Sequence, residues 1–216
     1  MKPYYEHAGI TIYHGDCREI LPHLPKVDLV LTDPPYGIGE AAGKNRTRCH
    51  LGRAKDYGVA SWDDAPPPQD LVQAVIGKGR SAILFGGNYF DVPPSSCWLV
   101  WDKDNTGDFA DCELAWTNLN KAVRKFKHRW NGMLQEDMAN KEFRWHPTQK
   151  PVPVMAWCLS LVPDAQTILD PFMGSGTTLV AAKNLGRQAI GIELEEKYCE
   201  IAALRLAQDN LFPEGI

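Results

Sequence analysis

The stretch VDLVLTDPPYG at residues 27–37 carries the strongest structural signal in this chain. Its run of valine and leucine is typical of a short strand buried on both faces of a parallel sheet. The strand leads into Asp33-Pro34-Pro35-Tyr36, where two prolines fix φ and remove two backbone donors, so the carbonyls there are rigid. We therefore expect a carboxylate, a rigid carbonyl and an aromatic ring together at the carboxyl end of a strand, where open α/β sheets bind their ligands.

Strand and helix patterns alternate on both sides of this stretch. Apolar runs predict strands at residues 10–14, 81–86, 97–101, 113–117, 167–172 and 188–194, and helical spacing predicts helices at 152–162, 177–185 and 195–206. This alternation predicts an α/β fold, a doubly wound and mostly parallel sheet with helices on both faces. Residues 1–216 are expected to form a single domain, with functional insertions at about 37–68 and 102–150, the least regular parts.

Composition is that of a globular protein, with 216 residues of which 44% are hydrophobic. The sequence contains no run of eighteen apolar residues and no signal-peptide pattern, so we expect a cytoplasmic protein without a membrane partner. The six cysteines form no CxxC pair and have no zinc-finger spacing, which predicts reduced, mostly buried thiols and no metal site.

The charge is unevenly distributed along the chain. Its net value is −4, which on its face argues against a nucleic-acid partner. Two stretches, 44–55 and 121–129, nevertheless hold five basic residues each and no acid. They indicate either a local footprint for a polyanion or two solvated loops, and charge alone favours the loops.

A glycine-rich turn follows the strand predicted at residues 167–172. It reads Pro171-Phe172-Met173-Gly174-Ser175-Gly176-Thr177, and Glu193 ends the next strand roughly 20 residues later, a spacing that suits the two hydroxyls of a ribose. A P-loop would need lysine where Thr177 stands, and a nicotinamide site would need glycine where Leu179 stands. A tight turn without a ligand is the remaining alternative.

The residues that follow the apolar strand at 27–32 suit the activation of an exocyclic amine. Such an amine is a poor nucleophile because its lone pair is delocalised into the ring. Asp33 and the Pro34 carbonyl could each accept one N–H and free the lone pair for attack on the methyl group of a sulfonium. Tyr36 offers a face on which an extruded base could stack. The alternative is a proline-rich turn that merely closes a strand.

Several motifs in one order resemble the DNA amino-methyltransferases, in particular their circularly permuted β group. These are Asp33-Pro34-Pro35-Tyr36, the downstream Asp170-Pro171-Phe172-Met173-Gly174-Ser175-Gly176-Thr177, the segment HPTQKP at 146–151, Gly15-Asp16, and more weakly Phe85-Gly86-Gly87-Asn88. The resemblance implies a permuted fold of the S-adenosylmethionine-dependent methyltransferase type, with double-stranded DNA as substrate. It implies a catalytic set of Asp33, Pro34, Pro35 and Tyr36. The cofactor set that it implies is Asp16, Cys17, Thr148, Lys150, Asp170, Pro171, Phe172, Gly174, Ser175, Gly176, Thr177, Glu193 and Leu194, with Lys150 at the methionine end.

The expected activity is methyl transfer to N6 of a flipped adenine. Asp as the first residue of the DPPY motif favours adenine in this family, whereas Ser favours cytosine N4, so cytosine is the first alternative. RNA, a protein amide and a catalytically silent binding protein are the others. The expected DNA contacts are Lys44, Arg46, Arg48, Arg53, Arg124, Lys125, Lys127 and Arg129, with Phe126 and Trp130 either stacking on bases or lying in the core. Because both insertions are short, relaxed specificity or help from a second subunit, as in a homodimer, is expected.

Overall fold

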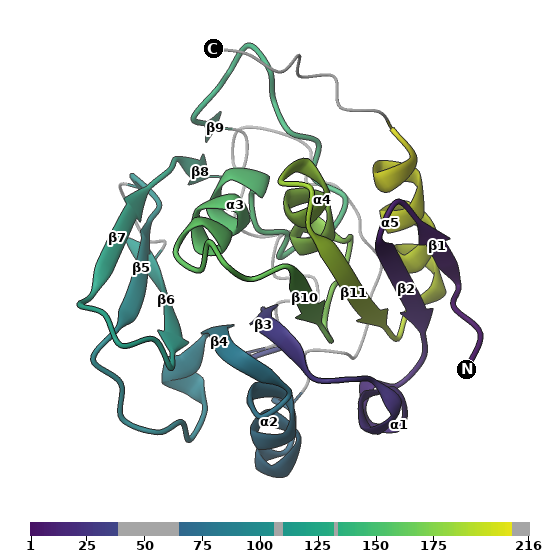
Figure 1. Cartoon of the computed structure of the whole chain (residues 1–216). Coiled ribbons are helices and arrows are strands. Elements are labelled where there is room, and N and C mark those ends of the chain that lie inside the picture. The colour runs from purple at the N-terminus through teal and green to yellow at the C-terminus, as the bar shows by residue number, and fades with distance from the viewer. Residues whose placement is uncertain (39–64, 106–109, 132–133, 209–216) are drawn as a thin grey trace.

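A nine-stranded sheet forms the centre of the molecule in the order β1-β2-β11-β10-β3-β4-β6-β5-β7 (Figure 1). The computed structural model describes residues 1–38, 65–105, 110–131 and 134–208. The strands of the sheet are β1 (Tyr5–His7), β2 (Ile10–His14), β3 (Val27–Thr32), β4 (Gly79–Phe85), β5 (Trp98–Asp102), β6 (Cys112–Thr117), β7 (Arg124–Lys127), β10 (Thr167–Asp170) and β11 (Gln188–Glu193). A separate hairpin pairs β8 (Trp130–Asn131) with β9 (Leu134–Gln135).

The middle of the sheet is parallel, as predicted. Strands β2, β11, β10, β3 and β4 all run in one direction. Strand β6 then runs antiparallel to β4, β5 antiparallel to β6, and β7 parallel to β5, while β1 forms an antiparallel hairpin with β2. The carboxyl ends of β3, β4, β5, β7, β10 and β11 therefore lie at the same edge of the sheet, and so does the amino end of β6.

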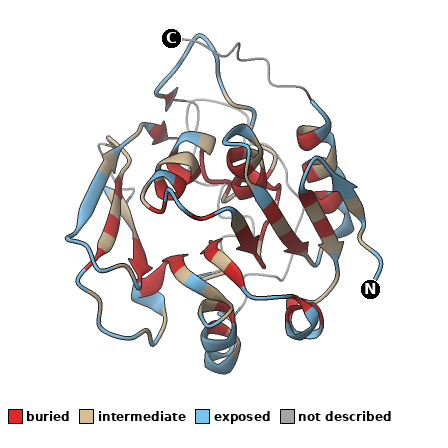
Figure 2. Cartoon of the chain, in the orientation of Figure 1, coloured by how far each residue is buried: buried red, intermediate tan, exposed pale blue. Residues whose placement is uncertain are grey.

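Helices cover both faces of the sheet (Figure 1). They are α1 (Cys17–Ile20), α2 (Gln69–Ile76), α3 (Val152–Ser160), α4 (Thr177–Asn184) and α5 (Glu196–Ala207), with short 3₁₀ turns η1 (Leu21–His23) and η4 (Gly87–Tyr89). Helices α3, α4 and α5 pack on one face in the larger hydrophobic core, and α1 and α2 pack on the other in a second core. Figure 2 shows that the buried residues concentrate in the central strands and on the helix sides that face them.

Strand β3 shows why its sequence is apolar without alternation. Leu29 and Leu31 are buried in the α3–α5 core, whereas Val30 between them is buried in the α1–α2 core. Because successive side chains point to opposite faces, a strand covered on both sides needs apolar residues throughout. This double cover fixes β3 in the sheet and places the residues after it at the sheet edge.

Most of the predicted elements are confirmed, with bounds that shift by at most two residues. No sequence pattern predicted β1 or α2, and the basic segment at 124–127 proves to be an edge strand, β7. The strand predicted at 113–117 is confirmed as β6, which lies inside the sheet between β4 and β5, so this part of the 102–150 region belongs to the scaffold. Residues Lys44, Arg46, Arg48 and Arg53 lie outside the described residues, as does Cys49.

The other five cysteines are free, and all but Cys112 are buried. Within the described ranges, no helix is both long and apolar enough to cross a membrane.

Candidate active site

Three carboxylates lie at the carboxyl ends of three neighbouring parallel strands, β3, β10 and β11. Asp33 comes directly after β3, Asp170 ends β10 and Glu193 ends β11. The Thr32 hydroxyl donates to Asp170 Oδ1 at 2.7 Å, and the Phe172 N–H donates to the same oxygen at 3.2 Å. Burial raises the pKa of Asp170 to about 6, although these donors act against the shift. The predicted site residues are thus brought to one edge of the sheet.

The glycine-rich turn after β10 depends on two left-handed residues. Gly174 has φ +50° and Gly176 has φ +78°, a region that side chains other than glycine rarely adopt. Gly176 is the N-cap of α4, so the turn leads directly into the helix amino end. The Met173 N–H donates to the Ile192 carbonyl at 3.1 Å, which ties the turn to β11.

Glu193 is held by two backbone donors. Its Oε2 accepts from the Gly174 N–H at 2.9 Å and its Oε1 from the Glu195 N–H at 2.8 Å. Burial raises the pKa of this carboxyl to about 7, with the backbone hydrogen bonds opposing the shift. A carboxylate offers about four lone-pair sites, so Glu193 still has two with which to accept the hydroxyls of a ligand.

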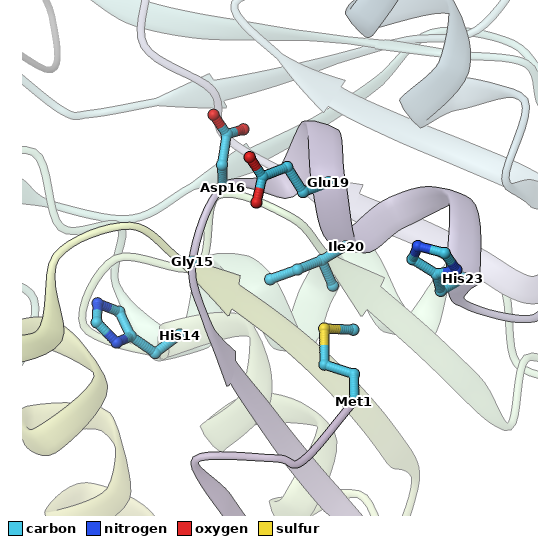
Figure 3. A pocket seen from close by; sticks show the side chains of 7 residues that line it. All are labelled: Met1, His14, Gly15, Asp16, Glu19, Ile20 and His23. Carbon is cyan, nitrogen blue, oxygen red and sulfur yellow. The ribbon is translucent and has the colours of Figure 1, made fainter.

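The Gly15-Asp16 turn after β2 is joined to the end of β11. The Gly15 N–H donates to the Glu193 carbonyl at 2.9 Å. The Asp16 carboxylate caps α1 by accepting the Arg18 N–H at 2.8 Å, and it also pairs with the Arg18 guanidinium. Figure 3 shows Asp16 beside Glu19 on the wall of a cavity of about 450 Å³. Cys17 is buried in the core beneath, which leaves mainly its backbone for contact with a ligand.

Asp33 has both carboxylate oxygens engaged. The Tyr36 hydroxyl donates to Oδ1 at 2.5 Å, and the Lys150 ammonium contacts Oδ2. Burial raises the pKa of Asp33, while Lys150 acts to lower it. Lys150 is only 6% exposed and also lies 3.2 Å from Glu113 Oε2. The structure therefore places Lys150 against the DPPY carboxylate, whereas the sequence had assigned it to the methionine end of a cofactor.

The Tyr36 ring is packed between residues of the segment after β4. A Cβ on Gly86 would lie 2.1 Å from the ring, so only glycine fits there. Tyr89 stacks on Tyr36 with ring centroids 4.8 Å apart and planes 13° apart, and Tyr89 itself is 50% exposed. A base stacking on that same face would have to displace Tyr89, because the two rings leave no gap between them.

A hydrogen-bonded clamp joins the glycine turn to the HPTQKP segment. Gln149 Oε1 accepts from the Ser175 hydroxyl at 3.2 Å, and Arg205 donates to the Ser175 carbonyl at 2.7 Å and to Thr177 Oγ1 at 3.2 Å. Arg205 also pairs with Glu142 at 3.2 Å. The side chains of Ser175 and Thr177, predicted to line a cofactor, therefore serve the clamp. Sequence reasoning missed Gln149, Glu142 and Arg205, since they meet only after folding.

In the same segment His146 is buried and Thr148 is partly buried. Burial lowers the pKa of His146 to about 3, so the ring is neutral. The Thr148 hydroxyl lies 3.1 Å from His146 Nδ1 and its N–H donates to the same atom at 3.3 Å. Leu194, by contrast, is 58% exposed at the tip of β11, and its carbonyl lies 3.1 Å from His14 Nε2.

Basic side chains in and after strand β7 are paired with acids, which the local sequence did not suggest. Lys125 lies 3.2 Å from Asp102, Lys127 lies 2.7 Å from Asp104, and Arg129 also pairs with Asp104. The acids come from the end of the neighbouring strand β5, so a stretch without acids in sequence has acids beside it in space.

The aromatic residues of this stretch belong to the core, which corrects the idea that they stack on bases. Phe126 is stacked on Trp157 with centroids 5.2 Å apart, and Trp130 is 8% exposed. Both rings pack with the larger core under β7.

Comparisons with known proteins agree with this geometry. A family model described as DNA methylase matches residues 96–204, just over half of the chain. The chain belongs to the DNA methylase family. This chain is similar to M2.LlaDCHI, a type II methyltransferase of Lactococcus lactis subsp. cremoris. The two are 26% identical over an alignment of 254 positions that covers 95% of this chain and 92% of the relative.

Two solved structures share the fold of this DNA methylase. The M1.HpyAVI–SAM complex is 23% identical and covers 92% of this chain and 100% of that chain, with a TM-score of 0.57. The PvuII DNA methyltransferase (cytosine-N4-specific) is 17% identical and covers 99% of this chain and 91% of that chain, with a TM-score of 0.61.

This DNA methylase takes its methyl group from S-adenosylmethionine, and the residues around the glycine turn fit that group. Glu193 retains acceptor capacity for ribose hydroxyls, and the left-handed Gly174 allows close approach to the backbone. Asp170 and Glu193 have raised pKa values that a positively charged sulfonium ligand would lower.

Proposed function

We propose that this DNA methylase modifies N6 of adenine in double-stranded DNA, acting on a base turned out of the duplex. The observation that carries the proposal is the half-buried Asp33 carboxylate, held beside Tyr36 and Lys150 next to the glycine turn. Asp as the first residue of the DPPY motif favours adenine in this family over cytosine. The membership in the family supports DNA as the substrate rather than RNA or a protein amide.

The proposed catalytic residues are Asp33, Pro34, Pro35 and Tyr36. Asp33 and the Pro34 carbonyl each accept one N–H of the target amine, which localises the nitrogen lone pair and orients it. The two prolines hold these acceptors rigid, and Tyr36 stacks on the extruded base after the base has displaced Tyr89 from its face. When bound, S-adenosylmethionine supplies the electrophilic methyl group.

The proposed cofactor residues surround the turn after β10. Glu193 accepts the ribose hydroxyls, Asp16 the adenine amine, and Thr148 holds the methionine end. The remainder of the set contributes backbone and packing, namely Cys17, Asp170, Pro171, Phe172, Gly174, Ser175, Gly176, Thr177 and Leu194. Lys150 contributes through Asp33, whose carboxylate it contacts.

The relatives named type II methyltransferases support a place in restriction–modification. The DNA-contacting surface is proposed to include residues 37–68 and the basic face of β7. A homodimer stays a prediction, which light scattering on the purified protein would test.

The deciding experiment expresses the chain in a host that lacks DNA methylation. Digestion of the host DNA to nucleosides, followed by mass spectrometry, separates N6-methyladenine from N4-methylcytosine, and single-molecule sequencing maps the modified sites. N6-methyladenine at defined sites is the expected result, and N4-methylcytosine would refute the adenine assignment. Labelled cofactor offered to duplex DNA, RNA and protein in parallel tests the substrate class.

A further inference from the structure

Four charged side chains of alternating sign form a row of ion pairs that ends at Asp33, where the target base is proposed to bind. Lys103 pairs with Glu113 Oε1, Glu113 Oε2 lies 3.2 Å from Lys150 Nζ, and Lys150 contacts Asp33. All four are at most 23% exposed, and Lys150 is the most buried at 6%. Charges this far from water are held by one another rather than by solvent.

The antiparallel part of the sheet brings Glu113 to this place. Glu113 is the second residue of β6 and pairs with Trp101 near the end of β5. Because β6 runs against β4 and β5, its beginning lies at the edge where the parallel strands end. Lys103 follows β5 at the same edge, and the segment before α3 supplies Lys150.

Glu113 remains ionised in this position. Burial acts to raise its pKa, but Lys150 and Lys103 outweigh burial and lower the pKa to about 2. Asp33 and Glu113 likewise outweigh the effect of burial on Lys150, whose pKa is raised, so the ammonium keeps its proton. Glu113 thus brings a permanent negative charge that no step at Asp33 uses directly.

We propose that Glu113 is a positioning residue for methyl transfer, holding Lys150 in place and offsetting its charge so that Asp33 remains a competent acceptor. The inference rests on the proposed role of Asp33. Lys150 fixes the carboxylate geometry, and without Glu113 the same ammonium, together with Lys103, would weaken Asp33 as a base.

The chemistry shows why the balance of charge matters. The nitrogen lone pair forms a bond to the methyl carbon while the carbon–sulfur bond breaks and sulfur keeps the electron pair. The nitrogen is left positively charged and then loses a proton, which Asp33 accepts before passing it to water. An uncompensated ammonium beside Asp33 opposes both the developing positive charge and the proton transfer.

The test replaces Glu113 by its neutral isostere. Glu113→Gln should lower kcat by about 10–100-fold, by analogy with the residues that orient metal ligands, whose loss reduces activity by this factor. The KM for DNA and the calorimetric dissociation constant for S-adenosylmethionine should stay unchanged. Asp111→Asn, an exposed acid two residues away, is the matched control.

A pH profile separates a charge effect from lost packing. Among the described residues, the groups that act on Asp33 are Tyr36, Lys150, Glu113 and, from the neighbouring strand, Asp170, while Lys103 lies behind Glu113. Loss of the Glu113 charge leaves two lysines on one side, which lowers the pKa of Asp33 and moves the acid limb of kcat to lower pH. Adding Lys103→Gln removes one of those positive charges, so the double variant should regain part of the kcat and shift the limb back.

The outcomes are distinct. A Glu113→Gln variant with wild-type kcat and pH profile overturns the inference. So does a loss that Lys103→Gln fails to restore and that accompanies a lower unfolding temperature, since that result describes a structural ion pair. If the wild-type protein does not methylate DNA, or if Asp33→Asn is fully active, the proposed function fails instead, and this inference falls with it.

Discussion

The cofactor side and the base side of the site hold their carboxylates by different means. On the cofactor side, the donors to Asp170 and Glu193 from the described part of the chain are neutral hydroxyls and backbone N–H groups, and burial raises the pKa values of the two carboxyls to about 6 and about 7. On the base side, lysines hold Asp33 and Glu113. Within the described residues, these two carboxylates on the cofactor side therefore lack a cationic partner until a positively charged ligand binds. Those on the base side are already paired with lysines of the protein.

This division suits the two ligands. A sulfonium is positively charged, so Asp170 and Glu193, whose donors are neutral, can interact favourably with it. The target base arrives neutral and becomes positive only during the reaction, so the base side needs a charge balance that already exists. The Thr32–Asp170 hydrogen bond links the sides, because Thr32 immediately precedes Asp33.

The largest effect is expected at Asp33. Asp33→Ala should lower methyl transfer at least about 10²–10³-fold, the usual cost of losing a group that stabilises the transition state. The dissociation constant for S-adenosylmethionine should barely change, because Asp33 serves the amine. Labelled-methyl transfer and calorimetry measure the two quantities. Because the variant leaves the buried Lys150 without this partner, Asp33→Asn is made alongside it, and wild-type turnover in both would remove Asp33 from the mechanism.

The second effect lies on the cofactor side. Glu193→Ala should weaken S-adenosylmethionine binding by roughly ten- to a hundredfold, since a hydrogen bond to a charged group contributes about 1.5–3 kcal/mol. Glu195→Ala is the control, because this residue lies two positions further along the chain and its side chain is 40% exposed. An unchanged dissociation constant in the Glu193 variant would contradict the ribose assignment.

The third effect is a pH dependence of S-adenosylmethionine affinity, which is expected from Glu193 and not from Asp33. The pKa of Glu193 is raised to about 7 in the free protein, so below pH 7 the carboxyl is largely protonated. If the ligand binds the ionised form, affinity should rise about tenfold between pH 6 and pH 8, as the fraction ionised before binding increases. Calorimetry across this range checks it, and Glu193→Gln should flatten the curve.

The raised pKa of Glu193 has the opposite effect on folding stability, which should decrease rather than increase with pH. Unfolded Glu193 ionises near its ordinary value of 4.5, so between that pH and about 7 the folded state holds the extra proton. This group's contribution to stability therefore decreases as pH rises through that window. A Glu193→Gln variant that loses none of this slope in denaturant titrations would argue against the raised pKa.

The sequence predicted the parts of the site that lie where parallel strands end. Asp33, Asp170 and Glu193 each follow an apolar run, so a local pattern located them. Glu113 begins a strand, and its position became functional only through the antiparallel pairing of β6, which no local pattern encodes. Arg205 likewise reaches the glycine turn from a helix 30 residues further along the chain.

The basic strand β7 extends the comparison to exposed ion pairs. On the base side the lysine pair is buried, but the side chains of Lys125 and Lys127 are 64% and 59% exposed. Pairs in water contribute only about 0–1 kcal/mol, so both lysines can leave their acids for a DNA phosphate at little cost. Their pairing in the free protein therefore does not oppose DNA binding.

The smallest effect is expected for DNA affinity at this strand. Replacing Arg124, Lys125 and Lys127 with Ala should weaken DNA binding without changing S-adenosylmethionine affinity, and each lost phosphate contact should reduce the log–log salt slope by about 0.9. Position along the strand sharpens the expectation, because β7 runs parallel to β5 and Lys127 lies at the active-site edge. Arg124 is three residues behind, about 10 Å from that edge, so Lys127→Ala should reduce the slope more than Arg124→Ala does. Binding titrations at several salt concentrations measure both, and equal slopes for all variants and the wild type would show that DNA does not pass over this strand.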